Sequence, residues 1–148
     1  MRLIPRLLFL TLVLGLVGPA LRAADAIELS ALLVSASKEP GASDPRLKPY
    51  EATLRRILRF ESFKLVGQGQ TSLQPPGKGN VSLGAGHSLQ IEAESNAGGS
   101  ERVQVSWQQG GRTLMRSGLV LRPGVPAVLG GPGTGEGGNV YAVIVIAR

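Results

Sequence analysis

The chain has 148 residues, of which 43% are hydrophobic, 18% are charged and only 4% are aromatic, and its formal net charge is +6. It contains no cysteine, which excludes a disulfide framework, a thiolate metal site and a cysteine nucleophile. The part of the chain from residue 27 to residue 148 has a length that suits one domain with a single core.

Residues 1–26 have the pattern of a secretory signal peptide. Two arginines precede an apolar run from Leu7 to Val17, and Ala24-Asp25-Ala26 fits a small-residue cleavage site. The run is shorter than the about 20 apolar residues that a membrane-spanning helix needs. We therefore expect cleavage near Ala26 and a soluble product, periplasmic or secreted, that begins at Ile27.

The excess of basic residues lies partly in this segment. Three of the 16 basic residues and one of the 10 acidic residues belong to it, so the mature chain carries a net charge of only about +4. A surplus this small, spread along the chain, does not favour nucleic acid as a partner.

The mature chain, residues 27–148, is predicted to begin with a buried strand followed by a helix. The run Ala31–Ala36 is apolar without alternation, which is typical of a strand covered on both faces. The sequence predicts a helix over about 45–60, with Ser43 or Asp44 as N-cap, although Pro49 disfavours helical geometry in its first turn. The expected apolar face of this helix comprises Leu47, Tyr50, Leu54, Ile57 and Leu58.

Everything after the helix is predicted to be strands and turns. Residues 61–67 resume extended structure, and the order strand, helix, strand suggests a crossover unit in which the helix covers one side of a sheet. Strand patterns flank Gly84–His87 and Gly110-Gly111, which predicts two hairpins. After a glycine-rich loop at 130–138, the run Asn139–Ala147 is apolar on both faces and is expected to be a central strand.

The fold class that follows is mainly β (α+β). We expect a single antiparallel β-sandwich-like domain of about 7–8 strands, with one amphipathic helix near the N-terminus covering the sheet. The first and last strands should lie where both the helix and the second layer cover them.

Three patterns suggest chemistry but have simpler interpretations. Gly133, Gly135 and Gly138 have dinucleotide-fingerprint spacing, yet a strand pattern follows where a pyrophosphate site needs a helix, so no cofactor is expected. His87 is the only histidine and has no second histidine or cysteine for a metal site, so we expect an exposed turn residue. Trp107 is in phase with the apolar positions of its strand, which predicts a core residue.

Glu92 and Glu94 share one face of a predicted strand, and paired carboxylates can perform acid–base chemistry. Their alternation with apolar residues is typical of a solvated face. We keep one enzymatic alternative, a hydrolase using His87 with Glu92 or Glu94. A second alternative is a small-ligand or carbohydrate binder, for which the chain offers few aromatic side chains.

The candidate docking residues are Arg55, Arg56 and Arg59 on the predicted helix. Glu51 can pair with Arg55 at the i, i+4 spacing and leave the other guanidinium groups free. A solvated face is the simpler interpretation, and an acidic protein surface or anionic lipid headgroups are the functional ones.

Six short segments of the chain form a recognisable set: Leu32-Leu33-Val34-Ser35-Ala36-Ser37, Asp44-Pro45-Arg46-Leu47 with Tyr50, Leu54-Arg55-Arg56, Phe60-Glu61-Ser62-Phe63, Leu121-Arg122-Pro123-Gly124 and Val128-Leu129-Gly130-Gly131. Together they resemble segments of small exported bacterial proteins of no established function. The resemblance implies export and a single domain, and it implies no site residue.

The function expected from the sequence is that of a non-enzymatic exported domain that acts by protein contact, as an accessory of an envelope or secretion assembly. No catalytic, metal or cofactor residue is expected. Peripheral binding to anionic membrane through the basic helix face is a further alternative.

Overall fold

The computed structural model describes residues 26–94, 101–135 and 137–148. Apart from Ala26, the expected signal peptide lies outside the described residues. The described residues form eight strands, a 3₁₀-helix and one α-helix: β1 (Ile27–Ser37), the 3₁₀-helix (Pro45–Tyr50), α1 (Glu51–Leu58), β2 (Ser62–Leu73), β3 (Gly77–Gly84), β4 (His87–Ala93), β5 (Glu101–Gln109), β6 (Arg112–Leu121), β7 (Ala127–Gly133) and β8 (Val140–Ala147). Among these residues, no helix has the length and apolar character needed to span a membrane.

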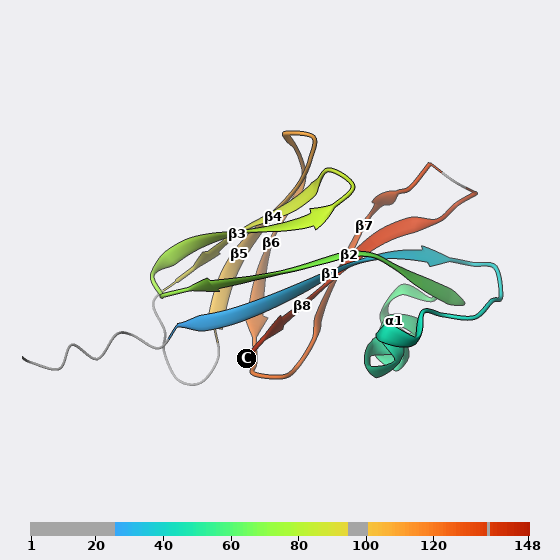
Figure 1. Ribbon diagram of the computed structural model, residues 1–148, viewed down its shortest axis with the longest axis horizontal. Coiled ribbons are helices and arrows are strands. Elements are labelled where there is room, and N and C mark those ends of the chain that lie inside the picture. The colour runs from blue at the N-terminus through green and yellow to red at the C-terminus, as the bar shows by residue number, and fades with distance from the viewer. Residues whose placement is uncertain (1–25, 95–100, 136) are drawn as a thin grey trace, which may run out of the picture.

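The strands form two antiparallel sheets of four strands each. The first sheet has the order β2-β1-β8-β7 and the second has the order β3-β4-β5-β6 (Figure 1). One hydrophobic core contains residues of both sheets, so the sheets pack on each other. The prediction of a mainly β (α+β) chain with one helix and 7–8 antiparallel strands is confirmed, but the helix follows β1 and is not at the N-terminus.

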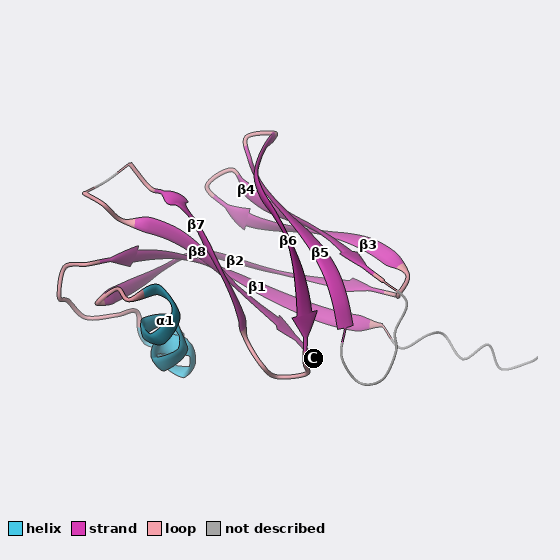
Figure 2. Cartoon of the chain, turned by 180° about the vertical axis from the view of Figure 1, so that it is seen from behind, coloured by secondary structure: helices cyan, strands magenta, loops and turns pink. Residues whose placement is uncertain are grey.

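The two central strands of the first sheet, β1 and β8, are buried on both faces, as predicted. On β1, Leu29 and Leu33 belong to the core between the sheets, whereas Leu32, Val34 and Ala36 belong to a second core beneath the helix. This alternation follows from the two-residue period of a strand. Figure 2 shows α1 on the side of the first sheet that faces away from the second sheet.

The predicted helix over 45–60 is wrong at its start. Residues Pro45–Tyr50 form a 3₁₀-helix and α1 begins only at Glu51, because Pro49 disfavours α geometry before it. The expected N-cap is confirmed, since the Asp44 carboxylate accepts a hydrogen bond from the backbone N–H of Arg46 at 3.0 Å.

The apolar face of the helix is confirmed in part. Leu47 and Leu54 are fully buried in the second core, and Tyr50 and Leu58 pack at its edge. Ile57, which was expected on this face, is 49% exposed.

The expected crossover between β1 and β2 is wrong. The two strands are antiparallel neighbours, with Leu33 opposite Gly67 and Ser37 opposite Ser62. A crossover joins parallel strands, whereas here the chain reverses direction and the helix lies within the connection. The expected role of the helix as a cover for one sheet face nevertheless holds.

The remaining turn predictions are largely confirmed. β3 and β4 form a hairpin, and Gly110 and Gly111, with φ of 58° and 80°, form the turn between β5 and β6. The glycine-rich loop is shorter than predicted because β7 extends to Gly133 and pairs with β8. A strand rather than a helix follows the glycines, which removes the geometry that a dinucleotide site requires.

One side of the two-sheet arrangement is closed by a close approach of β2 to β3. A Cβ added to Gly67 would overlap the carbonyl oxygen of Leu83, and one added to Gly69 would lie 2.5 Å from the carbonyl oxygen of Ser82. Both obstacles are backbone atoms, so a side chain here would force the strands apart.

We expect Gly67→Ala to lower the free energy of unfolding by about 3 kcal/mol, because the new methyl group would displace the backbone of β3. Urea denaturation would measure the change. Gly133→Ala is the matched control, since its Cβ would meet no atom closer than 3.6 Å. Equal midpoints for the two variants would contradict this account of the strand contact.

Candidate functional site

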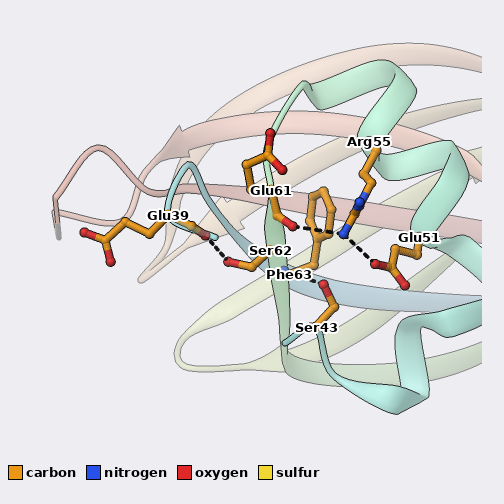
Figure 3. Close-up of polar contacts among 7 residues, drawn as sticks. All are labelled: Glu39, Ser43, Glu51, Arg55, Glu61, Ser62 and Phe63. Carbon is orange, nitrogen blue, oxygen red and sulfur yellow. Dashed lines mark hydrogen bonds and ion pairs between the residues drawn. The ribbon is translucent and has the colours of Figure 1, made fainter. Parts of the chain in front are cut away.

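Arg55, one of the three candidate docking residues, is held by contacts within the protein (Figure 3). Its guanidinium Nη2 donates to Glu51 Oε1 at 2.8 Å and to the backbone carbonyl oxygen of Glu61 at 3.2 Å. The predicted pair with Glu51 is therefore present. Through the second bond, Arg55 also ties the helix to the residue that precedes β2.

The loop between β1 and the 3₁₀-helix is fixed to the start of β2 by two side-chain hydrogen bonds, in addition to the backbone bond from Asp44 N–H to the Phe63 carbonyl oxygen. Ser43 Oγ accepts from the backbone N–H of Phe63 at 3.2 Å, and Ser62 Oγ donates to the carbonyl oxygen of Glu39 at 2.9 Å (Figure 3). With the Arg55 bridge, these bonds hold the helix against the first sheet.

Arg56 and Arg59 differ from Arg55. Both are exposed, and neither side chain makes a hydrogen bond or ion pair with any residue that the structure describes. Ile57, with its 49% exposure, lies between them in the sequence. We call Arg56, Ile57 and Arg59 the helix-end patch.

Arg59 adopts an unusual backbone conformation. It is the C-cap of α1, with φ of 54° and ψ of 37°, in the left-handed region. Glycine is the usual residue in this conformation because it has no Cβ to clash with the following carbonyl. Arginine at this position is therefore less favourable for the backbone than glycine would be.

Arg46, at the opposite end of the helical segment, is neutralised. Its Nε and Nη2 donate to the two carboxylate oxygens of Asp44 at 3.0 and 2.7 Å. These bonds from Arg46 hold the pKa of Asp44 down to about 2. The unpaired positive charge of the helical segment is thus reduced at this end.

The prediction that His87 is an exposed turn residue is wrong. Only Ala85 and Gly86 lie between β3 and β4, so His87 is the first residue of β4, and it is 1% exposed. Its Nδ1 accepts a hydrogen bond from the indole Nε1 of Trp107 at 3.0 Å. Because Nδ1 accepts, the neutral ring carries its proton on Nε2, and that atom has no partner among the described residues.

Trp107 is fully buried, as predicted, and organises the surroundings of His87. A Cβ added to Gly131 would overlap the Trp107 indole, so the ring lies directly against the backbone of β7. The Tyr141 ring meets His87 edge-on at a centroid distance of 4.6 Å. Four strands, β4, β5, β7 and β8, therefore meet at this buried aromatic cluster.

The structure does not bring His87 and the two glutamates together. His87 lies on the buried face of β4 with Leu89 and Ile91, whereas Glu92 lies on the opposite, exposed face and Glu94 is also exposed. The solvated-face interpretation of the glutamates is confirmed. Within the described ranges, no three His, Asp or Glu side chains gather as a metal site would require.

We expect the stability of the protein to fall as the pH is lowered from 7 to 5. Burial lowers the pKa of His87, so below its usual pKa of about 6.5 the unfolded chain binds a proton before the folded chain does. This contribution to stability is present above pH 6.5 and is lost at up to about 1.4 kcal/mol per pH unit as the pH approaches the folded pKa.

Urea denaturation at several pH values would measure this slope. His87→Asn is the control, because the Asn oxygen can accept from Trp107 but does not titrate in this range. Identical slopes for the two proteins between pH 7 and 5 would contradict the assignment.

We expect Arg59→Gly to raise the free energy of unfolding by about 0.5 to 1 kcal/mol, because it relieves the left-handed conformation. Arg56→Gly, inside the helix, should lower it by about 1 kcal/mol. Thermal and urea denaturation of both variants would measure these two changes in the free energy of unfolding. A loss of stability in Arg59→Gly would show that the backbone of Arg59 is not strained.

Comparisons with known proteins add no relative. No protein-family model matches the chain, and searches of curated proteins and of solved structures give no significant match.

Proposed function

We propose that this protein is a non-enzymatic exported domain that acts by contact with another protein, as an accessory of a bacterial envelope or secretion assembly. The observation that carries the proposal is the helix-end patch, in which a half-exposed Ile57 is flanked by the unpaired cations Arg56 and Arg59.

The chemistry of the patch favours an acidic partner surface. Arginine is enriched at protein interfaces, and an apolar side chain beside it supplies area that is removed from water on contact. Arg55 and Arg46 already have carboxylate partners, so they contribute less to this recognition. The docking surface expected from the sequence therefore shifts from Arg55, Arg56 and Arg59 to Arg56, Ile57 and Arg59.

The conformation of Arg59 supports a role for its side chain. A residue held in the left-handed region costs about 1 kcal/mol relative to a relaxed backbone. An ion pair between Arg59 and a carboxylate of the partner would offset this cost. The presence of arginine at this position is consistent with such a contact.

We expect a variant with Arg56→Glu and Arg59→Glu to fail to bind a partner protein that the unmodified protein captures. Reversal of two charges at the contact replaces attraction by repulsion and should weaken binding at least tenfold. The measurement is quantitative affinity capture from an envelope extract of the producing cell, followed by binding of the purified partner. The charge-matched control carries Lys38→Glu and Lys78→Glu, at two exposed positions outside the patch.

Vesicles separate this proposal from the membrane alternative. Binding to phosphatidylglycerol vesicles that weakens steeply with salt, without any captured protein, would favour peripheral membrane attachment through the same arginines. If the patch variant and the control captured equal amounts of the partner protein, the proposal would be wrong.

A further inference from the structure

We infer that the outer face of the first sheet carries a binding groove for a short neutral oligosaccharide, at a position separate from the helix-end patch. Two adjoining hollows of about 280 and 310 Å³ share Ser30, Gln70 and Arg148, so they form one continuous groove over β1 and β2.

The register of β1 and β2 places the lining residues in three cross-strand pairs. Leu32 lies opposite Gln68, Ser30 opposite Gln70, and Glu28 opposite Ser72. Tyr50, at the end of the 3₁₀-helix, borders one end of the groove, and Arg148 borders the side. From Glu28 to Leu32, β1 advances about 13 Å, which suits a ligand of two or three sugar rings.

The polar side chains of the groove are available to a ligand. Among the residues that the structure describes, the side chains of Ser30, Gln68, Gln70 and Ser72 have no hydrogen-bond partner. Each amide offers both a donor and an acceptor, and each hydroxyl does the same. Groups of this kind match the hydroxyl groups of a neutral sugar, which also donate and accept.

Other ligand classes fit less well. Among the described residues, the groove contains one cation, Arg148, with Glu28 beside it, and one cation is not the set of positive groups that a phosphate or polyanion needs. The backbone groups of β1 are already paired with β2 and β8, so an extended peptide could not add to β1. Within the described part of the chain, the large apolar side chains that line the two hollows are Leu29, Leu32 and Tyr50, and Leu29 is only 1% exposed, which is too little apolar surface for a lipid.

The groove also explains how a chain with few aromatic residues could bind a sugar. Tyr50 provides one partly exposed ring at the end of the groove, and one ring can cover one sugar face. Tyr50 is one ring only, and the two hollows are near the lower size limit of ligand pockets. We therefore expect a short ligand and weak binding.

The test is NMR titration of the ¹⁵N-labelled protein with three neutral trisaccharides, cellotriose, maltotriose and N-acetylglucosamine trimer, at millimolar concentration. We expect at least one of them to shift the amide signals of β1 and β2 around Ser30 and Gln70. A variant with Ser30→Ala and Gln70→Ala should weaken that binding at least tenfold.

The matched control carries Gln90→Ala and Ser106→Ala. These residues are also a cross-strand Gln–Ser pair, on the outer face of the second sheet, and they do not line the groove. The control should bind the trisaccharide as the unmodified protein does, and Tyr50→Phe should retain the ring and most of the affinity.

Three outcomes would overturn the inference: no shift with any of the trisaccharides, equal weakening by the control, or tighter binding of a galacturonic acid trimer than of all neutral ones. The variant with Arg56→Glu and Arg59→Glu should bind the trisaccharide normally. Failure of the groove and failure of the helix-end patch are therefore distinguishable.

Discussion

The burial of β1 and β8 on both faces is the constraint on which the rest of the structure depends. Because these two central strands are apolar on both faces, each face must pack against another layer, and the second sheet covers only one of the two faces. The connection between β1 and β2 supplies the other through Leu47 and Leu54. The hydrogen bonds of Arg55, Ser43 and Ser62 then secure that cover against the sheet.

The length of the cover determines where the sheet can be apolar. With eight residues, α1 is about 12 Å long, and the second core beneath it includes Leu32, Val34 and Ala36 of β1 but no residue of β1 before Leu32. Beyond it, the outward positions of β1 become Ser30 and Glu28, which tolerate water. The same boundary produces both candidate binding surfaces: the groove begins where the cover stops, and the helix-end patch lies on the cover itself.

Much of this architecture could be predicted from local patterns. The double-sided apolar runs identified the two central strands, the alternation around Trp107 placed that residue in the core, and paired glycines marked a hairpin turn. These signals succeed because a strand's two-residue period and a glycine's positive φ are recorded directly in neighbouring residues.

The errors came from features that neighbouring residues do not record. The burial of His87 depends on a turn of only two residues, Ala85 and Gly86, which brings the histidine into phase with Leu89 and Ile91. That phase was visible in the sequence, but the glycines around it suggested a longer turn. The contact of Gly67 with β3 and the register of β1 with β2 depend on residues that are distant in the sequence. The residue pattern within β1 or β2 alone therefore does not predict them.

The pairing of β1 with β8 also sets the order in which the fold can form. Strands β3 to β6 are joined in sequence as antiparallel neighbours, so the second sheet needs only local contacts. The first sheet, in contrast, requires Leu29 to meet Ala147, across nearly the whole described chain. The apolar faces of β1 thus stay without their central partner until β8 has been synthesised, and a chain that emerges from a ribosome remains incompletely folded until β8 is free.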